Sequence, residues 1–291
     1  MLSTYPQTLI DHLAEFNQKP TGNLDWDRSV LETMRRAASR KAAIAATEIA
    51  NVIRQADKDR QKAARAFPDM SDPAIYEMHS KLFIHIANEI VIAPQHRRFV
   101  VDDDNKEILR FLLLYFNNSP LAEDVFPGRG YKLHKNIMLQ GGPGVGKTMI
   151  MQCFSEYLRR INSPRFFHNL SVTQMVNYYT IHNNFDRYTF FEENSPGFLP
   201  RPENVCLNDV GLNDNKVFYG MNTSVLTDDF LLARNDIWAA YGKFAHVTTN
   251  LNEEALRVRF NQGDAYGRLV DRFKTYNVIP ISGSSRRKKS R

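Results

Sequence analysis

The first third of the chain has the hydrophobic pattern of helices. Over residues 28–67 Ala is frequent, Gly and Pro are absent until the end, and apolar residues recur at three- and four-residue steps in one thin stripe. Ser29 and Glu32 fit the S-x-x-E capping box, so we expect this long helix to begin there. Further helices are predicted over 74–92 and 105–116.

Beyond residue 130 the pattern changes to short apolar strands that alternate with helices. Strands are predicted over 136–140, 165–170, 204–207 and 245–249, and helices over 148–160 and 227–241. Ser171 and Gln174 form an S-x-x-Q box that predicts another helix start. Strand–helix alternation indicates a parallel sheet flanked by helices, an α/β fold. Residues 183–203 fit that scheme poorly and are expected to form a long loop.

Composition restricts the class of protein. The 291 residues are 43% hydrophobic and 24% charged, which excludes a disordered polyelectrolyte. There is no apolar run of about 18 residues, so no membrane span is expected. The N-terminus shows no secretory-signal pattern, so no secretion signal is expected. Cys153 and Cys206 lie in apolar stretches and are expected to be buried thiols in a reducing compartment. These features predict a cytoplasmic protein.

The net charge of +6 is concentrated in two segments. Residues 28–65 contain ten basic and four acidic side chains, and residues 286–291 contain five basic and no acidic ones, whereas the body between them is nearly neutral. Such segments are typical of contact with an acidic partner or a nucleic-acid backbone. A solvated helix lying over the domain is the alternative for residues 28–65.

The strongest chemical signal is the segment Gly-Gly-Pro-Gly-Val-Gly-Lys-Thr. It matches the P-loop pattern G-x-x-x-x-G-K-[ST] between a predicted strand and a predicted helix, as that motif requires. The glycines let successive N–H groups point at phosphate oxygens, and the helix adds its positive N-terminal end. Lys147 is expected to bind the β- and γ-phosphates of ATP, and Thr148 to coordinate Mg²⁺. The predicted ATP-binding residues are Gly141, Gly142, Pro143, Gly144, Val145, Gly146, Lys147 and Thr148.

A P-loop ATPase also needs an acidic strand end, and the best candidate is Asn208-Asp209. The usual pair at that place is Asp then Glu. Two registers remain open: either Asp209 holds the metal with no acid following, or Asn208 takes the metal position and Asp209 acts as a shortened base. Both predict slow hydrolysis, because one charge or one methylene of reach is missing. Asp209 acting merely as a turn cap is a weaker alternative.

Three later residues are candidates for contact with the reacting phosphate. Asn250 follows a predicted strand, where an amide can polarise the attacking water, although Asn is also common at strand ends. Arg268 and Arg272 lie four residues apart on a predicted helix, hence on one face. Such arginines can stabilise phosphoryl-transfer charge in cis or from a neighbouring subunit. Ion pairing with Asp264 and Asp271 is the alternative.

The order of these motifs resembles the AAA+ ATPases of the DnaC type, which include replicative-helicase loaders and the helper ATPases of some insertion sequences. The resemblance covers about residues 97–291 and extends to a Gly-x-Ser-x-Arg-like tail over 283–287. It implies that Asn250 is the first sensor, Arg268 a trans-acting arginine finger and Arg272 the second sensor. Two features depart from the family: Asn-Asp replaces Asp-Glu, and Tyr-Gly-Arg is one residue shorter than Tyr-Gly-x-Arg.

The resemblance also implies cofactors and partners. They are ATP and Mg²⁺, an ATP-dependent homo-oligomer, single-stranded DNA, and a replicative helicase bound by a separate N-terminal region. We accordingly divide the chain into a helical partner-binding region over 1–96, an AAA+ ATPase domain over 97–285 and a basic tail over 286–291. Two other functions remain open: a transposition helper that forms ATP-dependent filaments on duplex DNA, and an ATP-binding scaffold without turnover.

Overall fold

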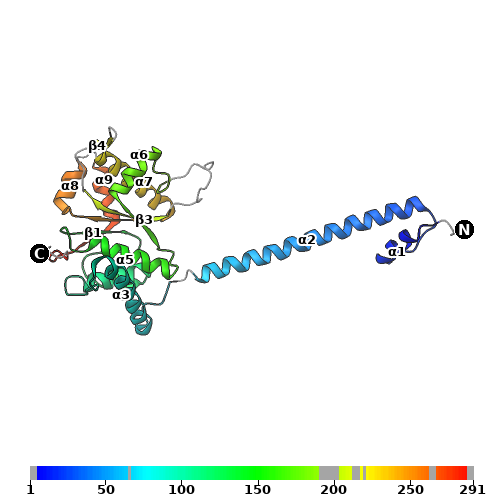
Figure 1. Ribbon diagram of the computed structural model, residues 1–291, viewed down its shortest axis with the longest axis horizontal. Helices are drawn as coiled ribbons and strands as arrows, with labels where there is room; N and C mark the ends of the chain where they lie inside the picture. Colours follow the sequence, from blue (N-terminus) through cyan, green and yellow to red (C-terminus); the bar gives the residue numbers. More distant parts are fainter. Residues whose placement is uncertain are drawn as a thin grey trace. The chain divides into compact units, whose positions relative to one another are not determined.

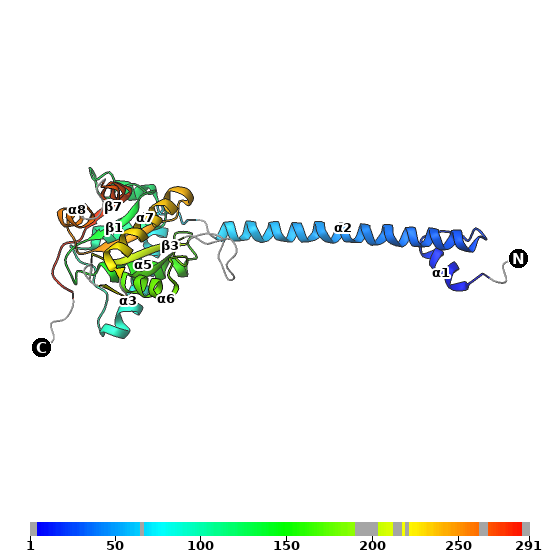
Figure 2. The same cartoon turned by 90° about the horizontal axis from the view of Figure 1, so that it is seen from above.

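A computed structural model of the chain forms two compact units, Met1–Ala64 and Arg65–Arg291, each described here by itself (Figures 1 and 2). The described residues are 5–64, 67–189, 203–211, 217–218, 221–261 and 267–286. No helix in this described part of the chain combines the length and apolarity needed to cross a bilayer.

The first unit consists of α1 (Gln7–Glu15) and the long helix α2 (Leu24–Ala64). The α2 helix begins before the predicted start, because the Asn23 side chain accepts a hydrogen bond from Trp26 N at 3.1 Å. Ser29 and Glu32 therefore lie inside the helix, and the predicted capping box is wrong. The sequence signal misled because an S-x-x-E spacing also occurs by chance within helices.

A small apolar cluster joins the two helices of this unit. Leu9 and Leu13 of α1 pack on Leu31 of α2, and next to them the buried Asp27 accepts hydrogen bonds from the Tyr5 hydroxyl and from Thr21. From residue 35 to residue 51 every side chain of α2 is exposed. The predicted apolar stripe is therefore present on this helix but lies open along that stretch.

The second unit is built on a five-stranded parallel sheet with the order β2-β3-β6-β1-β7. Its strands are β1 (Asn136–Gln140), β2 (Phe167–Ser171), β3 (Asn204–Val210), β6 (Ala245–Thr249) and β7 (Tyr276–Pro280). The predicted α/β fold with a parallel sheet flanked by helices is confirmed. The sequence did not reveal β7, which pairs with β1 along all five residues.

Helices cover both faces of this sheet, as Figure 1 shows for α3 and α5 on one face and α6 and α7 on the other. Ile137 and Leu139 of β1 enter the core under α3, α4 and α5, whereas Met138 enters the core under α6 and α7. The helices are α3 (Pro73–Gln95), α4 (Lys106–Phe116), α5 (Lys147–Arg160), α6 (Val172–His182), α7 (Thr223–Tyr241), α8 (Glu253–Asn261) and α9 (Arg268–Arg272).

Short elements complete this unit. They are the 3₁₀ helices η1 (Pro120–Asp124) and η2 (Phe273–Thr275) and the hairpin strands β4 (Val217–Phe218) and β5 (Met221–Asn222). The predicted capping box of α6 is confirmed, since Ser171 Oγ accepts from Gln174 N at 3.1 Å and Gln174 Oε1 accepts from Ser171 N at 2.9 Å. Of the predicted loop over 183–203, residues 190–202 lie outside the described residues.

The α3 helix belongs to the second unit, so the chain divides one helix earlier than the predicted boundary at 96/97. Phe83 stacks on Phe154 of α5 with ring centroids 4.2 Å apart, and His79 Nδ1 lies 2.7 Å from the Tyr157 hydroxyl. Ile86 is fully buried in the same core. Burial of this helix against α5 is the physical reason for the earlier boundary.

Two buried arginines organise the edge of the sheet at which the strands begin. Arg234 is fully buried and donates to the carbonyl oxygens of Glu203 and Phe244, which precede β3 and β6. Arg165 donates to the carbonyl oxygens of Tyr115 and Leu133 and lies over the Tyr115 ring. Carbonyl oxygens, rather than carboxylates, thus accept the hydrogen bonds that these two buried cations donate.

His246 of β6 is buried among aromatic rings beside these arginines. Ile137 N donates to His246 Nδ1 at 3.1 Å, and the rings of Phe116 and Phe167 pack against the imidazole. Burial, with smaller contributions from the nearby charges of Arg165 and Arg234, lowers the pKa of His246 to about 3. The imidazole is therefore neutral in the folded protein at all ordinary pH values.

This neutral histidine predicts a pH dependence of stability. Between the ordinary His pKa of about 6.5 and the folded value the unfolded chain binds a proton that the folded chain does not, so stability falls as pH falls, by at most about 1.4 kcal/mol per pH unit. We expect His246→Asn, whose Oδ1 keeps an acceptor for Ile137 N, to have a shallower dependence. Urea unfolding at pH 7, 6 and 5 measures both slopes.

The difference between the two proteins isolates His246. Burial also lowers the pKa of His79, which contributes the same slope to both proteins. Carboxylates with a lowered pKa, such as Glu156 at about 2, lose their stabilising effect only below the ordinary carboxyl range. Equal slopes for the wild type and His246→Asn between pH 7 and pH 5 would contradict this account.

Candidate nucleotide-binding site

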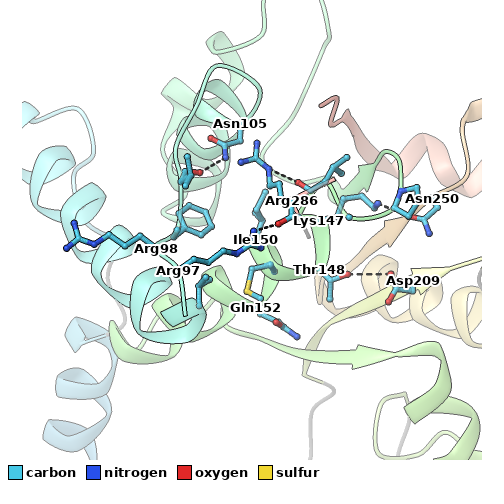
Figure 3. Close-up of a pocket in the computed structure, with 18 residues that line it drawn as sticks. Arg97, Arg98, Asn105, Lys147, Thr148, Ile150, Gln152, Asp209, Asn250 and Arg286 are labelled. Atoms are coloured by element: carbon cyan, nitrogen blue, oxygen red, sulfur yellow. Dashed lines mark hydrogen bonds between the residues drawn. The ribbon is translucent and has the colours of Figure 1, made fainter. Parts of the chain in front are cut away.

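The predicted P-loop, Asp209 and Asn250 come together at the edge of the sheet where the parallel strands end. The P-loop follows β1, Asp209 lies near the end of β3, and Asn250 follows β6. A cavity of about 820 Å³ opens there (Figure 3). Its lining includes the loop from Pro143 to Thr148 together with Asp209 and Asn250. Ligands of open α/β sheets commonly bind at this edge.

The P-loop backbone requires glycine at two positions for different reasons. Gly146, with φ of 106°, is the N-cap of α5, and no side chain caps that helix start. Gly144, with φ of 85°, passes so close to the chain end that an added Cβ would lie 2.3 Å from Ser285 Oγ. The helix N-terminus is therefore open to an anion on one side, while the loop is packed tightly on the other.

Lys147 is held inside the loop and connects it to Asn250. Its Nζ donates to Gly141 O at 2.7 Å, to Gly142 O at 2.8 Å and to Asn250 Oδ1 at 2.7 Å. Only 4% of the residue is exposed. The two residues expected on either side of a terminal phosphate thus lie in direct contact across β1 and β6.

Asp209 and Asn208 point in different directions. Asp209 has a left-handed backbone, with φ of 62°, and its Oδ1 accepts from Thr148 Oγ1 at 3.5 Å. Asn208 is buried, donates to Asn169 Oδ1 at 3.2 Å and accepts from Thr248 Oγ1 at 3.2 Å. This placement favours the register in which Asp209 lies beside the metal position. It places the predicted metal ligand Asn208 in an internal polar cluster.

Residues 97–100 and Asn105 line the cavity opposite the P-loop, and sequence reasoning missed this wall. Phe99 and Val100 line it together with Met149 and Ile150 of α5. The Asn105 side chain fixes the segment by donating to Val100 O at 2.9 Å and accepting from Asp102 N at 3.0 Å. No motif marks these residues, because the wall exists only once α3 and α4 pack beside α5.

Arg286, the first residue of the predicted basic tail over 286–291, is engaged with the protein itself. Its guanidinium forms a two-bond ion pair with Asp102, at 2.7 and 2.8 Å, and donates to Val145 O at 3.1 Å. The pair lowers the pKa of Asp102 through the hydrogen bonds from Arg286. The run of basic residues over 286–291 did not indicate this contact, because only the fold brings the Asp102 carboxylate next to Arg286. Residues 287–291 lie outside the described residues.

Arg268 and Arg272 lie at the opposite edge of the sheet. They belong to α9, which leads through η2 into the beginning of β7, about 16 Å of strand away from the carboxyl edge. There they line a second hollow with Trp238 and Lys135, and Arg272 pairs with Asp236 at 3.4 Å. Neither lines the P-loop cavity. The placement gives no support to contact of Arg272 with the nucleotide of its own subunit; the trans role of Arg268 stays a prediction.

Comparison with solved structures reveals similar folds at low identity. Domain III of the Thermotoga maritima replication initiation protein DnaA aligns with a TM-score of 0.43 and 16% identity over 63% of this chain and 65% of that one, slightly less than two thirds of its length. DnaI aligns at 0.42 and 18% over 69% and 93%, and the DnaC helicase loader at 0.40 and 15% over 63% and 93%. No protein-family profile and no curated protein sequence matches the chain.

The packing of the P-loop against the chain end yields a stability prediction. We expect Gly144→Ala to destabilise the protein by about 1–3 kcal/mol, because alanine is strained at this φ and its Cβ meets Ser285. Gly142→Ala is the matched control, since its φ is ordinary and an added Cβ meets nothing within 4 Å. Urea unfolding without nucleotide measures both. Equal stabilities of the two variants would contradict this packing role.

Proposed function

We propose that this protein binds ATP with Mg²⁺, hydrolyses it slowly, and uses that cycle to load a replicative helicase onto single-stranded DNA. The observation that carries the ATPase part is the contact of Lys147 with Asn250 in the same cavity as Thr148 and Asp209. The replication role rests on the order of motifs, which resembles the DnaC-type AAA+ ATPases. DnaI and the DnaC helicase loader are among the solved structures that align with this chain.

The residues of the cavity fit a nucleoside triphosphate. The open N-terminus of α5 and the Lys147 ammonium are suited to bind the β- and γ-phosphates. The apolar wall of Phe99, Val100 and Ile150 is suited to the base. The cavity thus has a positively charged side for the triphosphate of ATP and an apolar side for its base.

The metal position fits Mg²⁺ as it usually binds beside a triphosphate. Thr148 Oγ1 and the Asp209 carboxylate are the ligands this chain offers, and phosphate oxygens and water complete such a site. Bound Mg²⁺ supplies positive charge that neutralises the phosphates during transfer. Asp209 is the single carboxylate of the strand-end pair at the proposed Mg²⁺ position, since the neighbouring Asn208 is neutral and forms hydrogen bonds with Asn169 and Thr248.

Slow hydrolysis follows from that single acid. We propose that Asn250 orients the attacking water, but an amide cannot take the proton of that water as a carboxylate does. We propose that Arg268 of a neighbouring subunit supplies charge to the reacting phosphate, in an assembly that forms on ATP. Slow turnover also favours the second candidate, a transposition helper whose filaments on duplex DNA persist until ATP is hydrolysed.

The Lys147→Ala variant tests ATP binding and its use. We expect affinity for a fluorescent ATP analogue to fall roughly 10- to 100-fold, because charge-assisted hydrogen bonds contribute about 1.5–3 kcal/mol. ATP-dependent recruitment of a replicative helicase to single-stranded DNA should be lost with it. Lys81→Ala is the control, since this exposed lysine pairs with Glu77 on α3. A Lys147→Ala protein that loads helicase normally refutes the proposal, and filaments on duplex DNA without helicase favour the alternative.

The two members of the strand-end pair make opposite predictions for turnover. We expect Asp209→Asn to lower Mg²⁺-dependent ATPase activity by about 10²-fold or more, because it removes the carboxylate that faces Thr148. Asn208→Asp should raise activity by restoring a second acid. Asp229→Asn, on the exposed face of α7, is the control. Steady-state ATPase assays with single-stranded DNA measure all three. Wild-type activity that is absent and restored only in Asn208→Asp would identify a scaffold instead.

A further inference from the structure

Arg286 touches both walls of the nucleotide cavity (Figure 3). Toward the P-loop, its backbone N donates to Gly144 O at 2.9 Å and its Nε donates to Val145 O at 3.1 Å. Toward the opposite wall, its Nη1 and Nη2 bind the Asp102 carboxylate, and its carbonyl oxygen accepts from Arg97. One residue near the end of the chain therefore links the phosphate side of the cavity to the base side.

The segment 281–286, which we call the C-terminal strap, brings Arg286 to this place. The strap continues β7 and stays on the sheet edge, since Ile281 N donates to Gln140 O at 2.6 Å. It turns at Gly283, whose φ of 114° suits glycine and where an added Cβ would lie 2.6 Å from Asp104 Oδ2. The strap then passes along the P-loop where Gly141 and Gly144 lack side chains that would collide with it.

The guanidinium of Arg286 is oriented by protein oxygens. Its three nitrogens donate to Val145 and Asp102, and its side chain is 24% exposed. A fork-shaped pairing of this kind fixes direction as well as distance, which a lysine at the same place cannot do. The geometry thus suits a group that positions other parts of the site rather than one that contacts a phosphate.

We propose that Arg286, through its pairing with Asp102, is a positioning residue that holds the P-loop and the opposite wall of the cavity at the spacing a nucleotide needs. This inference rests on the proposed function, because it assumes that the cavity binds ATP. An exposed ion pair contributes little to stability by itself. Its effect here is preorganisation, since a site already held at the right spacing loses less freedom when ligand binds.

The expected signature is loss of affinity that does not depend on the γ-phosphate. A change in spacing between the two walls weakens ATP and ADP alike, by about tenfold, because both span the cavity from base to β-phosphate. A direct contact to the γ-phosphate would weaken ATP alone. Comparison of the two nucleotides therefore separates positioning from contact.

The experiment uses the full chain and four variants: Arg286→Gln, Asp102→Asn, their combination, and Asp103→Asn as the matched control. Asp103 is an exposed neighbouring carboxylate, so its variant removes the same charge without removing the pair. Titrations with fluorescent ATP and ADP give the dissociation constants, and thermal unfolding without nucleotide gives the stability. Asp102→Asn leaves the backbone contact of Arg286 with Gly144 in place, so it tests the pair even if Arg286→Gln does not fold.

We expect each single variant to bind both nucleotides about tenfold more weakly, the combination to be no weaker than either, and the control to match the wild type. If the variants bind both nucleotides as tightly as the wild type, with or without a lower unfolding temperature, this inference is wrong but the proposed function is not affected. Loss of ATP but not ADP binding in Arg286→Gln, with normal Asp102→Asn, also overturns it in favour of phosphate contact. A wild-type chain that binds neither nucleotide overturns the proposed function and this inference together.

Discussion

The pairing of β1 with β6 on one side and β7 on the other is the constraint from which the site follows. In parallel pairing, strands that begin together end together, so Gln140 lies opposite both Thr249 and Pro280. The residues that follow these three positions are the P-loop, Asn250 and the C-terminal strap. Two backbone bonds continue the pairing past the strands: Gly141 N donates to Thr249 O, and Ile281 N to Gln140 O. The contact of Lys147 with Asn250 is a direct result.

The two edges of the sheet solve opposite problems. Where the strands begin, Arg165 and Arg234 are buried and donate hydrogen bonds to backbone carbonyl oxygens. These bonds connect the loops that lead into the strands. Where the strands end, the amides of the α5 N-terminus have no side-chain cap, and the cavity opens beside them. The edge at which the strands end thus presents a helix start without a side-chain cap, an arrangement that suits the binding of a phosphate.

The parts of this site that sequence predicts are those with local causes. The P-loop and the capping box of α6 each depend on residues within one turn or loop, so the place of both could be read directly, and for the capping box the partners as well. By contrast, the wall formed by residues 97–100 and Asn105 depends on how distant helices pack, and the Asp102–Arg286 pair joins positions 184 residues apart. Nothing in a run of basic residues tells which one will meet a carboxylate. The strand β7 was not predicted because Asn277 interrupts its apolar pattern. The Asn277 side chain bonds to the backbone of Lys132, a contact between distant parts of the chain that the sequence does not reveal.

The orientation of Asp209 illustrates a second limit. Side chains alternate along a strand, so the two adjacent candidates point in different directions, but alternation alone does not tell which of them faces Thr148. The left-handed backbone at Asp209 turns the chain at that point, so that Asp209 rather than Asn208 faces Thr148. Asn and Asp adopt this conformation more readily than most residues, so the sequence permits the turn without requiring it.

The membership of α3 in the second unit changes how the chain can be divided in the laboratory. A fragment ending at residue 96 would carry Phe83 and Ile86 without the core that buries them, and the remaining chain would lose one side of that core. Exposed apolar surface of that kind makes proteins stick to unrelated partners and to each other. A fragment that ends at Ala64 leaves the α3–α5 core whole. Binding seen with the shorter fragment would therefore report on α1 and α2, whereas binding seen with the longer one would mix recognition with exposed core.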